Sequence, residues 1–245
     1  MKNTIIVLFT IFGINIHSQN LAGIVTYKKK IETMNLDTLE NNSAKVFLKK
    51  MFLDAQIAAE NIKYQLKFSN KESEFKAEDI LDKESDFAIK TALMMEGGDG
   101  IFYTDLKTKT QIFEIEAYER FFLVTSNIDS LKWTITDQIK KIGKYTCYKA
   151  MGEKLFQNQY GTSYKPVEAW FTTDIPVPFG PAKYCNLPGL IVELKVQQVT
   201  FYLTKIEFKE QDEIIIKQPK KGKLITEKEF EAVGKKMHDK FVKMR

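Results

Sequence analysis

A proline-rich connection between two strand-like segments constrains this chain most. Val167–Thr173 and Leu190–Val196 are rich in apolar and β-branched residues, and Pro176, Pro178, Pro181 and Pro188 lie between them. Proline fixes φ and has no backbone N–H to donate, so residues 176–188 cannot form a central strand. We therefore predict a rigid, irregular connection there, which we call the signature loop (residues 173–189).

The rest of the chain is dominated by short strand-like segments joined by turns. In the clearest of them Ile62, Tyr64, Leu66 and Phe68 alternate strictly with polar residues, as in a strand with one buried face. The other predicted strands are Leu21–Glu32, Ser73–Ala77, Ile101–Asp105, Gln111–Ala117, Glu119–Ser126, Trp133–Thr136, Lys144–Glu153, Thr200–Lys209 and Glu213–Lys217. This spacing predicts an α+β fold built on a curved, mainly antiparallel, meandering sheet, half-barrel-like in shape.

Helices are predicted at two places, on the concave face of this sheet or at one end of it. Ser43 can cap a helix over Ala44–Glu60, where apolar residues fall near helical spacing. Thr226 and Glu229 form a capping box that opens a C-terminal amphipathic helix over residues 226–245, with Phe230 and Val233 on its apolar face. Residues 79–96 are expected to form a helix or an irregular excursion.

The N-terminus indicates export. Residues 1–19 combine Lys2 with an apolar run from Ile5 to Ile16, which is shorter than the about 20 residues that span a bilayer and suits a signal peptide. A buried first helix is the alternative. Residues 20–245 are then expected to form one domain in the periplasm or outside the cell, with no transmembrane segment in the mature chain.

The polar composition excludes several classes of site. One histidine, His238, remains beyond the predicted signal peptide, so Ser-His-Asp and Cys-His catalysis have no support, and the spacings of metal sites and phosphate-binding loops are absent. The 37 basic and 32 acidic residues are well mixed along the chain, which does not indicate nucleic-acid binding. We expect no cofactor and no metal.

Two blocks of sequence resemble a known family. AWFTTDIP, FGP and LPGLIVEL within residues 166–196, and KWTITDQIKKIGKYTCYKA at Lys132–Ala150, are similar to the signature of the GLPGLI family of exported Bacteroidetes proteins. The first glycine of the family motif is Asn186 here, and asparagine tolerates the left-handed conformation better than other non-glycine residues. The resemblance implies membership but no activity, because that family has no established function.

Cys147 and Cys185 are the only cysteines. An even number of cysteines in an oxidising compartment favours a disulfide, so we predict a Cys147–Cys185 bond that ties the signature loop to the sheet. Two separate buried thiols are the alternative.

The predicted function is non-catalytic binding of an apolar ligand or of an envelope protein. A rigid loop on a sheet is a common place for a binding site. The candidate binding residues are Trp170, Pro176, Phe179, Gly180, Pro181, Leu187, Pro188, Gly189, Leu190 and Ile191. The alternative is a hydrolase that uses carboxylates such as Glu168, Asp174 or Glu193, of which Glu168 shares strand parity with Trp170.

Overall fold

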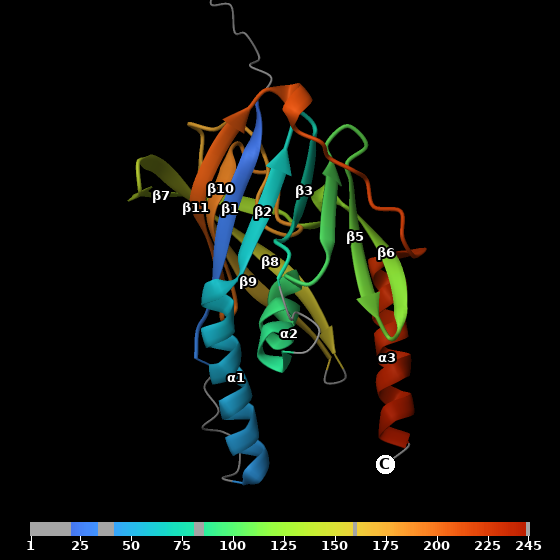
Figure 1. The fold of residues 1–245 in the computed structure, drawn as a ribbon. Coiled ribbons are helices and arrows are strands. Elements are labelled where there is room, and N and C mark those ends of the chain that lie inside the picture. The colour runs from blue at the N-terminus through green and yellow to red at the C-terminus, as the bar shows by residue number, and fades with distance from the viewer. Residues whose placement is uncertain (1–20, 34–41, 81–85, 159–160, 244–245) are drawn as a thin grey trace, which may run out of the picture.

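The described part of the chain builds on one large open sheet. The computed structural model describes residues 21–33, 42–80, 86–158 and 161–243, which form a mixed sheet of 12 strands and three α-helices (Figure 1). The strands are β1 (Ala22–Ile31), β2 (Lys63–Phe68), β3 (Glu72–Ala77), β4 (Ile101–Asp105), β5 (Thr110–Ala117), β6 (Arg120–Asn127), β7 (Trp133–Ile142), β8 (Tyr145–Asn158), β9 (Gly161–Thr172), β10 (Leu190–Val196), β11 (Val199–Lys209) and β12 (Lys223–Thr226). The helices are α1 (Ser43–Asn61), α2 (Phe87–Met94) and α3 (Glu227–Lys243).

Two antiparallel meanders meet at the first strand. The order is β12-β6-β5-β4-β3-β2-β1-β11-β10-β9-β8-β7, so β1 lies in the middle with β2 on one side and β11 on the other. The chain leaves the first meander at β6 and enters the second at its outer edge, β7. One pair, β12 with β6, is parallel, and the sheet is not closed, because β12 and β7 end it.

Most predicted strands are confirmed, and one is wrong. Residues 213–217 lie partly in a short 3₁₀ turn (Gln211–Glu213) and otherwise have no regular structure, although their apolar residues suggested a strand. The edge position beside β6 is taken by β12 instead, which begins in the lysine-rich segment that follows Pro219. The predicted signal peptide, residues 1–19, lies outside the described residues.

The main core lies on the inner face of the sheet, which we define as the face that carries Tyr27 and Tyr64. Alternate residues of β1 and β2 point into it, and Tyr27, Tyr64 and Leu66 are fully buried. Phe75 lies at its centre, stacked on Tyr64 at 5.6 Å between ring centroids and edge-on to Phe201 at 5.9 Å. Aromatic pairs of this kind contribute about 1 kcal/mol beyond area burial.

The signature loop fills this core rather than covering it. Phe179 and Leu187 of the loop, with Ile191 at the start of β10, are at most 2% exposed and belong to the same hydrophobic cluster as Tyr27 and Phe75. The backbone of the loop closes on itself through Asn186 N to Pro178 O (2.9 Å) and Ile191 N to Phe179 O (3.0 Å). Tyr27 Oη donates to Ile191 O at 2.6 Å and so fixes the start of β10, directly after the loop, to the side chain of a β1 residue. The irregular connection predicted from the prolines is therefore present, and it is buried.

The helices differ in how firmly they pack. Figure 1 shows α1, α2 and α3 at the same end of the sheet, with α1 and α3 extending beyond it. Along α1 only Ala55 and Ala59 are buried, and both contribute to the main core. The capping box that opens α3 is confirmed: Glu229 N donates to Thr226 Oγ1 at 3.2 Å, and Thr226 N donates to Glu229 Oε2 at 2.7 Å. Of the described helices, none is long and apolar enough to span a bilayer.

The predicted disulfide is wrong: Cys147 and Cys185 are both free and buried. Cys147 lies on β8 and packs with Trp170 and Val192 on the outer face, opposite the main core. Cys185 lies in the loop on the inner face, where Gln111 Nε2 approaches its Sγ at 3.4 Å. The sheet therefore separates the two sulfurs. Burial raises the pKa of Cys147 to about 11 and that of Cys185 to about 12, so both are unreactive thiols.

Candidate functional site

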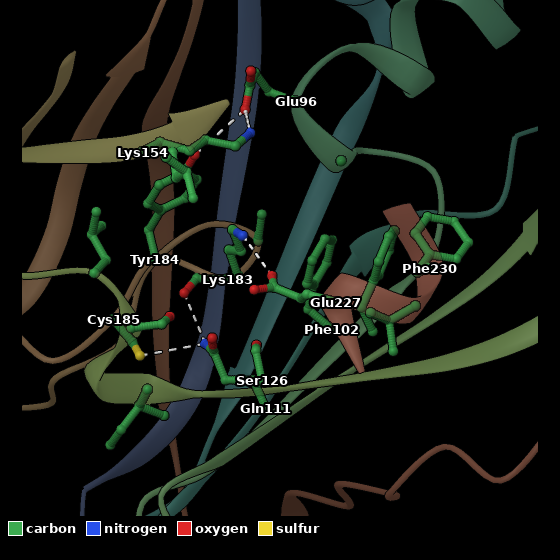
Figure 2. A pocket seen from close by; sticks show the side chains of 18 of the residues that line it. Glu96, Phe102, Gln111, Ser126, Lys154, Lys183, Tyr184, Cys185, Glu227 and Phe230 are labelled. Carbon is green, nitrogen blue, oxygen red and sulfur yellow. Dashed lines mark hydrogen bonds and ion pairs between the residues drawn. The ribbon is translucent and has the colours of Figure 1, made fainter. Parts of the chain in front are cut away.

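A pocket opens where the signature loop meets β4, β5, β6, β8 and the start of α3. Its volume is about 520 Å³, within the range of small-molecule sites. Figure 2 shows side chains from these elements converging on it, with Phe102 and Phe230 at one side and Glu96, Lys154 and Tyr184 at the other. The segments that build it are far apart in sequence, so the pocket exists only in the folded sheet.

One wall of the pocket is apolar. Phe102 of β4 stacks on Phe113 of β5 with ring centroids 4.1 Å apart. Val124 of β6 and Phe230 of α3 continue this wall. Phe230 is half-buried and packs edge-on against Phe122 at 5.5 Å, which also anchors α3 to the sheet. This wall can bury a hydrocarbon or aromatic group.

The rest of the pocket lining is polar. Its first feature is an ion pair that crosses the pocket. Lys183 of the loop reaches Glu227 of α3 at 2.7 Å, which links the two elements (Figure 2). Lys183 is itself fixed, because its carbonyl oxygen accepts from Gln111 Nε2 at 2.8 Å. The pair is one-third to two-fifths exposed, so it orients the two elements more than it stabilises them.

The second polar feature is centred on Glu96. Lys154 Nζ lies 2.9 Å from Glu96 Oε2, and Tyr184 Oη donates to the same oxygen at 3.4 Å. Burial and the nearby Glu96 charge raise the pKa of Tyr184, so its hydroxyl stays protonated and acts as a donor. Glu96 is thus an acceptor that two groups already satisfy.

Behind Glu96 lies a buried lysine that the sequence analysis missed. Lys29 is fully buried, and its Nζ donates to Ala92 O at the end of α2 and to Met95 O, at 2.5 and 2.9 Å. It also lies over the rings of Tyr64 and Phe201, at 5.1 and 5.4 Å from their centroids. Burial lowers its pKa to about 7, although the charges of Glu96 and Asp99 oppose the shift. The signal was strand parity, because Lys29 lies on the same face of β1 as the buried Tyr27 and Ile31.

The candidate residues of the signature loop are mostly core residues. Phe179, Gly180, Pro181, Leu187, Gly189, Leu190 and Ile191 are buried, whereas Pro176 and Pro188 are exposed. The loop residues that line the pocket are 182–185, which lie between Pro181 and Leu187. Asn186 has the left-handed conformation expected of it, with φ 71°, and its side chain donates to Asp129 Oδ1 at 3.0 Å.

Trp170 and the predicted carboxylates lie away from this pocket. Trp170 is on the outer face, where its Nε1 donates to Glu168 Oε1 at 2.8 Å and Lys140 Nζ lies 4.2 Å from its ring centroid. Glu168 pairs with Lys149 and Glu193 with Lys140, at 2.9 and 2.8 Å. Burial would raise the pKa of Glu168, but hydrogen bonds from Lys149 and Trp170 outweigh it and the pKa is lowered. Asp174 is exposed at the start of the loop.

Among the described residues, no group of three or more His, Cys, Asp or Glu side chains is placed so that it could hold a metal ion. The pocket does hold four glutamates, Glu96, Glu153, Glu227 and Glu231, but two of them are bound by lysines. The pocket is therefore a preformed site with one apolar wall and a polar part in which lysines and glutamates form ion pairs with one another.

Comparison with known proteins gives a short family match and a distant structural one. A family model described as a protein of unknown function, Porph_ging, matches residues 157–193, which include the end of β8, all of β9, the signature loop and the start of β10. No curated protein matches the chain. Structures of PNGF-II in space groups P21 and C2 are similar to it, with TM-scores of 0.47 and 0.48 and identities of 13% and 14%. Each match covers 84% of this chain and 31% of that chain, so this chain spans about a third of the length of those it matches.

Proposed function

We propose that this chain is an exported, non-catalytic envelope protein that binds a largely apolar ligand in the pocket between the signature loop and α3. The observation that carries the proposal is the pocket of about 520 Å³, with stacked Phe102 and Phe113 on one side and Lys154, Lys183 and Tyr184 on the other. Such a site suits a ligand with an apolar body and one polar end.

The polar wall supports binding over chemistry. Glu96 and Glu227 are each held by a lysine, and Tyr184 is a protonated donor. Charged groups that are paired with one another keep fixed positions and protonation states. They can orient the polar end of a ligand without exchanging protons with it. A protein partner that inserts one apolar side chain would use the same wall, and is the other form of the proposal.

Local backbone strain also supports a functional role for this wall. Glu96 and Ala182 have φ values of 53° and 51°, a left-handed conformation that costs about 1 kcal/mol or more for a residue with a Cβ. Both residues line the pocket. Strained residues of this kind concentrate at binding and active sites, because the surrounding structure is retained to hold them.

The wider setting is part of the same proposal. We infer that the chain belongs with the exported GLPGLI proteins that its signature resembles, and that the sheet acts as a half-barrel whose interior is filled by the loop. The amphipathic helix α3 then forms one side of the pocket through Phe230. Residues 1–19 would direct the chain to the periplasm or the cell exterior.

Filling the pocket tests the proposal. Ser126 lines it from β6, and Ser126→Trp adds an indole to the wall. With anilinonaphthalene sulfonate as an apolar probe that carries one anionic group, we expect fluorescence titration to show about tenfold or more loss of affinity, equivalent to about 1.4 kcal/mol. Thr134→Trp, at an exposed position on β7, is the matched control and should leave binding unchanged.

Native mass spectrometry of protein purified from the producing cells tests whether a natural ligand is bound in the pocket. A reproducible adduct that Ser126→Trp removes and Thr134→Trp retains would support the pocket. Probe binding that is equal in all three proteins, with no adduct in any of them, would contradict it.

A carboxylate-dependent hydrolase remains the second candidate, and the four glutamates around the pocket are the observation in its favour. It requires that Glu227→Gln or Glu153→Gln abolish turnover of an ester or glycoside substrate while probe binding is retained. If wild-type protein turns over no such substrate, binding is the remaining activity of the pocket.

A further inference from the structure

The first half of α1, residues 43–53, is a helix with little packed around it. Its buried residues, Ala55 and Ala59, both lie beyond this half. Val46, Phe47 and Leu53 are 67%, 61% and 53% exposed. A helix with exposed apolar residues needs a partner surface, because short helices gain most of their stability from packing.

Val46 and Leu53 form one exposed stripe with Ile57, which is 59% exposed and lies one turn beyond this half, and lysines flank it. Phe47 lies about 100° away from Val46 and is not part of the stripe. At 100° per residue, Val46, Leu53 and Ile57 fall within about 40° of one another on the helix surface. Lys49 and Lys50 lie beside this stripe, on opposite sides of it, and residues 43–53 contain no acidic side chain. Lys50 pairs with Asp54 at 2.7 Å, but this is a surface pair that contributes little.

We propose that this half of α1 docks on an anionic lipid surface. The stripe would enter the boundary between headgroups and acyl chains, and the lysine side chains would extend along it so that their ammonium groups reach the lipid phosphates. The charge complementarity between Lys49, Lys50 and an anionic headgroup selects this partner. The inference does not depend on the pocket.

A second copy of the chain is a poorer partner for the same stripe. In a symmetric dimer each copy presents the same patch, so Lys49 and Lys50 of both copies would lie in one interface to which residues 43–53 supply no acidic side chain. Repulsion between like charges disfavours that arrangement. A lipid surface meets the same residues with opposite charge.

The position of α1 in the fold agrees with docking. Figure 1 shows α1 extending beyond the end of the sheet, with α2 and α3 at the same end. On α2, Phe87 and Met94 are 62% and 71% exposed, and they add apolar surface at this end of the molecule. The sheet itself would not need to move for this end to approach a membrane.

Vesicle flotation of the purified protein tests the proposal. We expect binding to vesicles of phosphatidylglycerol mixed with phosphatidylcholine and little binding to phosphatidylcholine alone. Each lysine near an anionic surface strengthens binding about fivefold, so Lys49→Gln with Lys50→Gln should weaken it about thirtyfold. Val46→Ser with Leu53→Ser should abolish binding, and because these residues are exposed the variant should melt like wild type.

Matched controls lie on β7, where Lys141 and Ile139 are exposed. Lys141→Gln and Ile139→Ser should bind like wild type, and amide exchange of residues 43–53 should slow when anionic vesicles are added. Binding that is equal on both kinds of vesicle, or unchanged in Lys49→Gln with Lys50→Gln, would overturn the proposal. A dimer in solution that Val46→Ser with Leu53→Ser dissociates would overturn it as well.

Discussion

The signature loop and the helix α1 reverse the usual relation between regular structure and burial. The loop has no helix or strand, yet Phe179 in it is fully buried. The helix α1 is regular over 19 residues, yet only two of its side chains are buried. The loop is core because its proline-fixed backbone satisfies its own polar groups, as in the bond from Asn186 N to Pro178 O. The helix satisfies its backbone internally and so can stand away from the core.

This difference assigns separate roles to the two regions. A loop held from many sides gives the pocket a fixed wall at residues 182–185. A helix attached through Ala55 and Ala59 leaves a surface open for a partner. The experiments that follow test this contrast, from the largest expected effect to the smallest.

The largest effect is expected at Gly189, at the end of the loop. A Cβ there would lie 2.0 Å from Thr172 O, which is backbone and cannot give way. Gly189→Ala should therefore destabilise the protein by about 4 kcal/mol or more, or prevent folding. Gly143→Ala is the control, since nothing lies within 4 Å of its Cβ position and only its φ of 58° is unfavourable. It should cost about 1 kcal/mol in chemical denaturation.

A pair of phenylalanine truncations compares the two regions directly. Phe179→Ala removes a fully buried ring and should lower the free energy of unfolding by about 3–5 kcal/mol. Phe47→Ala in α1, where the ring is 61% exposed, should change it by about 0.5 kcal/mol or less. Equal effects in urea denaturation would show that the loop is not part of the core.

The pH dependence of stability tests how the helical end is attached to the sheet. Lys29 binds the end of α2, and burial lowers its pKa from 10.5 to about 7. Between these values the unfolded chain holds this proton and the folded chain does not, so stability should rise with pH by about 1 kcal/mol per unit. Lys29→Met should lose this slope.

Two buried tyrosines set the highest pH at which the effect of Lys29 on stability can be measured alone. Burial raises the pKa of Tyr27 and Tyr64, so the unfolded chain loses their protons first and stability should fall above about pH 10. Thermal melts between pH 7 and 9.5 therefore isolate the lysine. A flat profile in wild type across this window would contradict the assignment.

The smallest effect is expected at Asn186. Its φ of 71° and the bond from its side chain to Asp129 both favour asparagine over other residues with a Cβ. Asn186→Ala should cost about 1 kcal/mol. Asn186→Gly should stay within about 0.5 kcal/mol of wild type, because relief of the left-handed strain offsets the lost bond. If alanine were tolerated as well as glycine in a thermal melt, the turn would not require this conformation.

The sequence predicts local structure well where one pattern decides it. Alternation located β2 within one residue, and the Thr226–Glu229 capping box fixed the start of α3. The prolines correctly excluded a strand in the signature loop. The pairing of strands was harder to predict from the sequence. β12 has only four residues, and it joins the sheet by pairing with β6, which lies 100 residues earlier in the chain.

The site was predicted less well, because it depends on contacts between distant segments. Lys183 and Glu227 are 44 residues apart, and Tyr184 and Glu96 are 88 apart. No local pattern places such residues together. The proline-rich, family-like loop drew attention to Phe179 and Leu190, which are core residues, whereas residues 182–185 line the pocket. The cysteine count could not reveal that the sheet lies between Cys147 and Cys185.

Amide hydrogen exchange tests the central contrast most directly. The amides of Tyr184, Asn186 and Ile191 donate to backbone carbonyls inside the loop, so they should exchange only when the whole protein unfolds. Amides in residues 43–53 of α1 should exchange by local opening, orders of magnitude faster. Loop amides that exchange as fast as those of α1 would contradict the account, because the pocket would then have no fixed wall.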